Sequence, residues 1–183
     1  MKKTIFIYGF KGYIAQSRIA KQILRTPVLC FEYNSSLTQT IEEIAKDLDK
    51  FIIKNTESKE TVNLIGISAG GIIAEYYSKF ENSKKINKIA TVCSPLNGTY
   101  ITKFYSKNLK GLKQLSKDSK LLNKIKSKRL GKNKIINFYC PFDILVPGKS
   151  GKGENPRTIW NFFHFTIQED KQIFKKIKRF FEE

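Results

Sequence analysis

Long uninterrupted apolar runs are missing from this sequence, and their absence excludes a membrane-spanning class of protein. No stretch approaches the roughly 20 apolar residues that cross a bilayer. The apolar run that follows the first three residues is interrupted by Gly9 and Lys11, too soon for the core of a secretory signal. We therefore expect the mature chain to start at Met1 and to reside in the cytoplasm.

Cysteine and acidic side chains are also scarce. The three cysteines, Cys30, Cys93 and Cys140, show no C-x-x-C spacing, which argues against a disulfide framework or a metal site and predicts reduced, buried thiols. Only 16 Asp and Glu oppose 34 Lys and Arg, so the net charge of +18 should attract anionic surfaces. The charge does not identify the anion, and a coding bias towards lysine, isoleucine and asparagine would produce the same excess.

The remaining composition is that of a folded globular protein. Hydrophobic residues make up 40% and charged residues 27% of the chain, a balance that differs from disordered or fibrous sequences. A length of 183 residues suffices for one well-buried core and is short for two. We expect residues 1–183 to form a single domain.

Apolar β-type runs alternate with amphipathic segments along most of the chain. The pattern predicts strands at 4–8, 27–32, 61–67, 86–93 and 134–140, and helices at 14–24, 38–54, 69–80 and 168–181. Near-continuous Val, Ile and Phe in the strands are typical of a parallel sheet. The fold class predicted is therefore α/β, a mainly parallel sheet with helices on both faces.

One segment, residues 99–133 (the cap segment), departs from this alternation. It has no convincing strand, and its pattern is that of a basic amphipathic helix that Gly111 could divide into two. Its lysines recur at three- and four-residue steps, at positions 103, 107, 110, 113, 117, 120 and 124, opposite Ile101, Phe104, Leu112, Leu115 and Leu122. The lysine face could rest on anionic lipid, or it could be a solvated face whose leucines pack on the domain.

The strongest chemical signal is the string G-x-S-x-G at residues 66–70. An apolar strand precedes it and a helix follows, so Ser68 would project its hydroxyl from a tight turn in which Gly66 and Gly70 avoid steric overlap. An ordinary glycine-rich turn is the alternative. The string matches neither of the glycine-rich phosphate-binding motifs.

A serine nucleophile needs a base and an acid that orients the base. His164 is the only histidine in the sequence, so it is the predicted base. Asp143 follows the predicted strand at 134–140, which gives the order Ser, Asp, His found in α/β-hydrolases. Asp143 could instead be a plain turn residue, and Glu154 is then the reserve acid.

The other carboxylates after Ser68 are less suitable. Glu75 and Glu81 belong to the helix after the nucleophile and should face away from it or outward, and Asp118 lies in the cap segment. For the oxyanion, we predict backbone N–H donors from Ala69, directly after the nucleophile, and from Phe10, in the glycine-rich loop after the first strand.

Four motifs together resemble the lipase and esterase branch of the α/β-hydrolases. Tyr-Gly-Phe-Lys-Gly at 8–12 is similar to the oxyanion loop of that family, residues 66–71 to its nucleophile elbow, 94–99 to its Ser-Pro-His-x-Gly-Thr loop, and 143–147 to its acid loop. Tyr8, Ile67 and Leu96 stand where the family usually has histidine. The resemblance implies a minimal α/β-hydrolase fold in which the cap segment occupies the place of a lid.

The function predicted is hydrolysis of a carboxylic ester, including a lipid ester, through an acyl-enzyme on Ser68, without cofactor or metal. A thioesterase or an acyltransferase would use the same triad. An anionic membrane surface is a further expected partner of the cap segment, which would make the protein peripheral to the membrane. A non-enzymatic basic binding protein is the other class, but the lysines form no recognised nucleic-acid motif, so nucleic acid is not expected as a partner.

Overall fold

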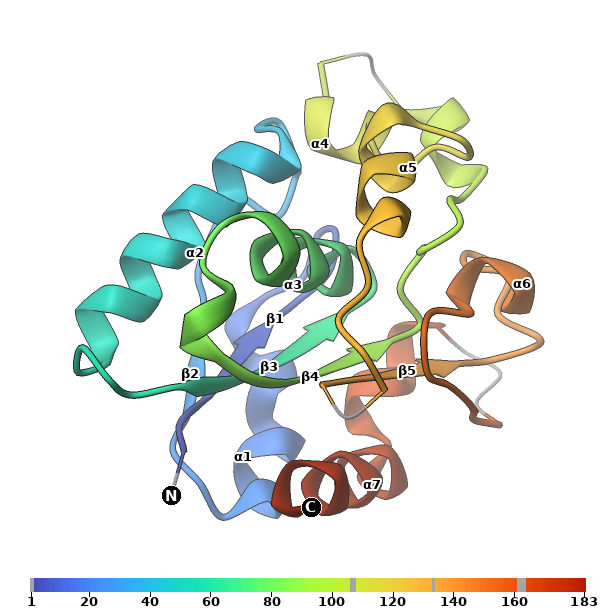
Figure 1. The fold of residues 1–183 in the computed structure, drawn as a ribbon. Coiled ribbons are helices and arrows are strands. Elements are labelled where there is room, and N and C mark those ends of the chain that lie inside the picture. Colours follow the sequence, from blue (N-terminus) through green and yellow to red (C-terminus); the bar gives the residue numbers. More distant parts are fainter. Residues whose placement is uncertain (1, 106–107, 133, 161–163) are drawn as a thin grey trace.

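The computed structural model describes residues 2–105, 108–132, 134–160 and 164–183 and shows a parallel sheet between helices (Figure 1). Within these residues the sheet has the strand order β2-β1-β3-β4-β5-β6, and every neighbouring pair is parallel. The strands are β1 (Thr4–Ile7), β2 (Val28–Cys30), β3 (Val62–Ile67), β4 (Ile86–Val92), β5 (Ile135–Tyr139) and β6 (Pro156–Thr158). The predicted α/β class is confirmed.

Helices cover both faces of the sheet, as the alternating pattern predicted (Figure 1). One face carries α2 (Ile41–Asn55) and α3 (Ala69–Phe80), and the other carries α1 (Arg18–Leu24) and α7 (Lys171–Glu182). Each face buries its own hydrophobic cluster against these helices. The short helices are η1 (Ile14–Ser17), η2 (Ser83–Lys85), η3 (Ile101–Phe104), α4 (Lys110–Lys113), α5 (Lys120–Ser127), α6 (Gly148–Gly151) and η4 (His164–Glu169).

Local sequence explains where the longer helices begin. At the start of α2, the Thr40 hydroxyl accepts a hydrogen bond from the Glu43 N–H, and the Glu43 carboxylate accepts one from the Thr40 N–H. The Asp170 carboxylate accepts bonds from the first N–H groups of α7 in the same way. No helix within the described ranges combines the length and apolar character that crossing a bilayer requires.

The cap segment folds as short helices rather than as one or two long ones. Gly111 lies inside α4, and the break comes later, at Asp118, whose φ of 60° is left-handed. The Ser119 hydroxyl then accepts a hydrogen bond from the Leu122 N–H and begins α5. The expectation that Phe104 shares the apolar side is wrong, because its side chain is 85% exposed.

Strand β6 was not predicted from the sequence. It contains three residues, all of them exposed, and it begins with a proline, so it has neither an apolar run nor a period-two pattern. It pairs with β5 at the edge of the sheet. Among the cysteines, Cys93 and Cys140 are buried, Cys30 is half-buried, and all three are free thiols.

Candidate active site

Ser68 occupies the turn between β3 and α3 in a conformation that the surrounding glycines make possible. Its backbone angles, φ 52° and ψ −122°, are rare for a residue with a side chain. A Cβ at Gly66 would overlap the Gly71 backbone, and one at Gly70 would overlap the Ile7 carbonyl oxygen. These close approaches explain why the motif needs glycine on both sides of the serine.

His164 and Asp143 meet Ser68 in one hydrogen-bonded chain. The Nε2 atom of His164 lies 3.0 Å from Ser68 Oγ, and Nδ1 lies 2.6 Å from Asp143 Oδ2. Their side chains are 11% and 1% exposed, so the chain of bonds is largely shielded from water. The structure therefore brings together the three side chains that the sequence proposed, from positions 96 residues apart in the chain.

Backbone donors hold the Asp143 carboxylate in place. Oδ1 accepts hydrogen bonds of 2.9 Å from the N–H groups of both Leu145 and Val146. A carboxylate so bonded acts as an acceptor towards the imidazole, which places the proton of neutral His164 on Nδ1. The lone pair on Nε2 then faces the Ser68 hydroxyl, the arrangement that a general base requires.

Among the other carboxylates, Glu75 and Glu154 bind residues other than Ser68 and His164, and for Glu75 the structure excludes one of the two expected orientations. Glu75 does not face outward: it is 3% exposed and binds Lys79 at 2.9 Å, and burial raises its pKa although the Lys79 charge opposes that shift. Glu154, the reserve acid, binds Lys79 at 3.0 Å and accepts bonds from the Leu130 and Gly131 N–H groups. Glu81 and Asp118 are exposed.

A cavity of about 260 Å³ opens beside the Ser68 hydroxyl. Its wall is mostly apolar and comes from the loops after β1, β3, β4 and β5 and from the cap segment. The lining residues are Phe10, Lys11, Ser68, Ala69, Pro95, Thr99, Ile101, Tyr105, Leu112, Leu115, Leu145, Val146 and His164. Both residues predicted to supply oxyanion donors, Phe10 and Ala69, thus lie on the same pocket as the serine.

The loop that carries Phe10 is fixed close to the nucleophile. A Cβ at Gly9 would come within 2.9 Å of the Ser68 Cβ, so only glycine fits between them. Tyr8 stacks on Tyr33 with ring centroids 4.9 Å apart, and its hydroxyl accepts a 3.0 Å bond from the Tyr33 N–H. Tyr8, which replaces a histidine of the resembled family, therefore anchors this loop to the segment after β2.

Comparison with known families identifies the chain. The model of the palmitoyl protein thioesterase family matches residues 14–139, which include Ser68 and end before Asp143 and His164. The chain belongs to the palmitoyl protein thioesterase family. Comparison with curated protein sequences found no match.

Solved structures with the same architecture are α/β hydrolases. A bromoperoxidase from Bacillus anthracis has a TM-score of 0.76 at 13% identity, and the match covers 100% of this chain and 92% of the bromoperoxidase. A mature lipase from Bacillus licheniformis has a TM-score of 0.75 at 11% identity, and the match covers 98% of this chain and 91% of the lipase. An α/β hydrolase from a lagoon-sediment metagenome of Mar Chica, Morocco, has a TM-score of 0.71 at 16% identity, and the match covers 97% of this chain and 89% of the hydrolase. The minimal α/β-hydrolase fold is confirmed.

Two residues near the site of this thioesterase-family chain escaped the sequence interpretation. The Lys11 ammonium lies 5.5 Å from the ring centroids of Phe10 and Tyr105, which places a cation at the pocket wall. The Cys93 thiol contacts Asp143, and its pKa is raised by burial and by the nearby carboxylate. The position of Cys93 directly after β4, at the same edge of the sheet as Ser68, was the one feature of the sequence that could have indicated its place near the site.

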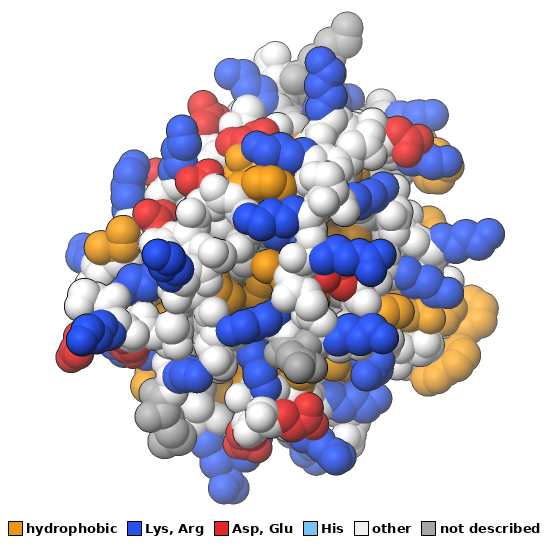
Figure 2. Space-filling model, in the orientation of Figure 1, with side chains coloured by type: hydrophobic (Ala, Val, Ile, Leu, Met, Phe, Trp, Pro, Cys, Tyr) orange, Lys and Arg blue, Asp and Glu red, His pale blue; other side chains and the backbone are white. Residues whose placement is uncertain are grey.

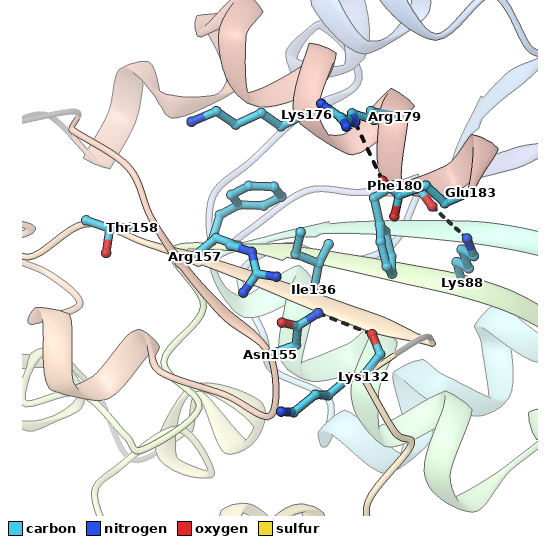
Figure 3. A pocket seen from close by; sticks show the side chains of 11 residues that line it. Lys88, Lys132, Ile136, Asn155, Arg157, Thr158, Lys176, Arg179, Phe180 and Glu183 are labelled. Carbon is cyan, nitrogen blue, oxygen red and sulfur yellow. Dashed lines mark hydrogen bonds and ion pairs between the residues drawn. The ribbon is translucent and has the colours of Figure 1, made fainter.

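A second and larger hollow, the basic cleft, lies between α7 and strands β5 and β6 (Figure 3). Its volume is about 710 Å³, and its cationic lining consists of Lys88, Lys132, Arg157, Lys176 and Arg179. Lys88 donates a 2.7 Å bond to the Phe180 carbonyl. No serine, cysteine or histidine is among the described residues that line this cleft. Among the described residues of the whole chain, no group of His, Cys, Asp and Glu side chains could hold a metal ion.

Proposed function

We propose that this protein is a serine hydrolase that removes an acyl group from a thioester or carboxylic ester through an acyl-enzyme on Ser68. The observation that carries the proposal is the chain of hydrogen bonds from Asp143 through His164 to Ser68, which ends at the wall of an apolar pocket. A nucleophile, a base and an orienting acid are the parts that acyl transfer needs.

In the first half-reaction the Ser68 oxygen attacks the acyl carbonyl carbon while His164 Nε2 takes the hydroxyl proton. The carbonyl oxygen becomes an oxyanion, and the N–H groups of Phe10 and Ala69 donate hydrogen bonds to it. The intermediate collapses as the bond from carbon to the thiolate or alkoxide leaving group breaks. The leaving group takes the proton from His164, and the acyl group stays on Ser68 as an ester.

In the second half-reaction a water molecule replaces the leaving group. His164 Nε2 takes a proton from the water, and the hydroxide oxygen attacks the acyl-Ser68 carbonyl carbon. Collapse of the second intermediate breaks the bond to the Ser68 oxygen, which regains its proton from His164. The products are a carboxylic acid and the free enzyme.

The lining of the pocket supports an apolar acyl group as the part of the substrate that is bound. Its volume of about 260 Å³ lies below the ~300–1,000 Å³ of pockets that enclose drug-sized ligands. A short acyl group fits inside, whereas a long chain would extend past the pocket mouth. Membership of the palmitoyl protein thioesterase family favours a thioester over the oxygen ester that the sequence motifs suggested first.

A fluorophosphonate activity probe tests the proposal, because it reacts with a serine only where a base activates the hydroxyl. We expect the folded protein to be labelled, the Ser68→Ala variant to be unlabelled, and the Ser127→Ala variant, which changes an exposed serine on α5, to be labelled like the wild type. Labelling that survives in Ser68→Ala, or none in the wild type, would overturn the proposal.

A panel of soluble acyl thioesters and p-nitrophenyl esters of increasing chain length then distinguishes the substrates. Higher kcat/KM for thioesters than for esters of the same chain would assign the thioesterase activity. A preference for the esters would return the assignment to an esterase that uses the same residues.

A further inference from the structure

Large hydrophobic side chains that face water gather at one edge of the molecule. Within the described residues seven such side chains are more than half exposed, and one of them, Ile53, lies on α2. The other six lie in the connecting segments that follow strands and form what we call the apolar rim: Tyr13, Tyr100, Phe104, Phe142, Ile144 and Trp160. Exposed hydrophobic residues scattered singly are ordinary, but six at one edge indicate an interaction surface.

Four residues of the apolar rim are close in sequence to residues that line the pocket of Ser68. Tyr100 and Phe104 directly adjoin the pocket residues Ile101 and Tyr105, and Ile144 directly precedes Leu145. Tyr13 follows Lys11 by two residues. The remaining two residues contact each other, with ring centroids of Phe142 and Trp160 separated by 5.9 Å. Because the carboxyl ends of parallel strands meet at one edge, loops from β1, β4, β5 and β6 contribute to one surface.

The chemistry of the rim fits a lipid surface. Tryptophan and tyrosine combine an apolar ring with a polar group and favour the boundary between water and lipid. Phe104 and Ile144 are 85% and 87% exposed. They are placed to enter an apolar layer.

Positive charge lies among these side chains and extends beyond them. The Lys103 ammonium lies 5.5 Å from the ring centroid of Tyr100, and Lys11 lies at the pocket wall. Figure 2 shows Lys and Arg side chains distributed over the whole visible face, with exposed hydrophobic surface at its right-hand edge. A net charge of +18 adds long-range attraction to a negatively charged surface.

The leucines of the cap segment do not provide this surface. Leu121, Leu122 and Ile125 of α5 are buried in the core beneath it, and the Lys124 ammonium lies over the rings of Tyr76 and Phe80. A membrane contact through the lysine face of the cap segment, as the sequence suggested, would leave these apolar side chains out of reach of lipid. The loops around the pocket offer the exposed apolar groups instead.

We propose that the apolar rim docks on the surface of an anionic bilayer and so presents the Ser68 pocket to acyl groups held at that surface. The reason for docking rests on the proposed hydrolase activity, but the docking itself does not require Ser68. A long acyl chain that extends from the pocket would leave it along the rim, on the side that faces the lipid.

Binding can be followed by fluorescence because the sequence contains one tryptophan, Trp160, and it belongs to the rim. The probe is vesicles of phosphatidylcholine with about a third phosphatidylglycerol, with pure phosphatidylcholine vesicles for comparison. We expect the emission of Trp160 to shift to shorter wavelength and to be quenched by brominated acyl chains, and the protein to co-sediment with the anionic vesicles. Absence of these changes, or equal binding to both vesicle types, would overturn the proposal.

Matched variants test whether the rim is the contact. The double variant Phe104→Ser with Ile144→Ser should bind anionic vesicles at least tenfold more weakly, whereas Ile53→Ser should bind like the wild type. Circular dichroism checks that each variant is folded. Equal weakening in Ile53→Ser, or undiminished binding in the double variant, contradicts the proposal. Ser68→Ala should bind vesicles normally, so a failure of docking and a failure of the proposed chemistry give different results.

Discussion

The pocket at Ser68 and the basic cleft beside α7 are both hollows of this molecule, and they differ in almost every other respect. The cleft is larger, about 710 Å³ against 260 Å³. Five cations line it, whereas the Ser68 pocket contains a serine hydroxyl that is hydrogen-bonded to His164. The pocket is small and mostly apolar, and Ser68 and His164 meet at its wall. Chemistry follows from that contact and not from volume.

The two hollows also differ in their relation to the sheet. The pocket lies at the carboxyl ends of the parallel strands, where the loops after several strands approach one another. The cleft is lined by residues of β5, β6 and α7, along the face of these strands (Figure 3). Pro156, at the start of β6, lacks a backbone N–H, which limits the pairing of a further strand at the β6 edge of the sheet.

Removal of the Ser68 hydroxyl should have the largest effect on activity. We expect Ser68→Ala to lower kcat/KM for a soluble acyl thioester by about 10⁴-fold or more, because the acyl-enzyme cannot form. The fold should persist, since the substitution removes a single oxygen from a half-buried side chain. Steady-state kinetics with matched thermal melts measures both, and residual activity within tenfold of the wild type would contradict the assignment.

A buried ion pair connects the two regions and should affect stability strongly. Lys79, on the helix after Ser68, is 2% exposed and binds both Glu75 and Glu154, and Asn155, the next residue, lines the basic cleft. Lys79→Ala leaves the buried Glu75 carboxylate and the half-buried Glu154 carboxylate without this cation and should lower the free energy of unfolding by about 3–5 kcal/mol. Urea denaturation measures the loss, and a change under 1 kcal/mol would show that the network contributes little.

The pH dependence of that loss gives an independent check. Burial already raises the pKa of Glu75 in the folded wild type, and removal of the Lys79 charge should raise it further. A carboxyl group whose pKa is higher in the folded than in the unfolded state favours folding when protonated, and this contribution is lost as the pH rises. The deficit of Lys79→Ala relative to the wild type should therefore be smaller at pH 5 than at pH 8.

A smaller effect is expected when the pocket is narrowed. Ile101 lines the pocket from η3, so Ile101→Trp should fill part of it and reduce kcat/KM for an octanoyl thioester about tenfold more than for a butyryl thioester. Phe104→Trp changes an exposed residue of the same short helix and is the control. If both variants change the chain-length preference equally, the cavity does not hold the acyl chain.

The smallest effect should come from the basic cleft. The double variant Arg157→Ala with Lys176→Ala removes two cations that line it, neither of which lies on the Ser68 pocket. We expect kcat and KM for a soluble thioester to change by less than about twofold, because exposed charges act weakly across the width of the molecule in physiological salt. A tenfold loss of kcat would contradict the separation of the two regions.

Much of the fold and the position of the nucleophile could be predicted because the relevant signals are local. The strand, the turn with its two glycines and the helix around Ser68 are contiguous in the sequence, and α3 begins and ends where it was predicted. His164 could be predicted as the base without spatial information, because it is the only histidine in the sequence. Asp143 followed from its position after an apolar strand, and the structure places it next to His164.

The failures concern features that depend on distant partners. The burial of Glu75 depends on Lys79, Asn137 and Glu154, and an acidic residue on a helix does not reveal such partners in sequence. The exposure of Phe104 also could not be predicted from spacing, because the cap segment turns repeatedly instead of continuing one helical period. The short edge strand β6 gains its pairing from β5 and not from its own composition.

Direct observation of the acyl-enzyme is the closest test of the proposed role of Ser68 as the nucleophile. The purified protein is mixed with a soluble octanoyl thioester, quenched in acid within the first turnovers, and digested for peptide mass spectrometry. We expect an octanoyl group on the peptide that contains Ser68, with accumulation and loss that match the rate of turnover. Thiol release with no acyl group on Ser68 at any time, or an acyl group carried by another residue, would contradict that role.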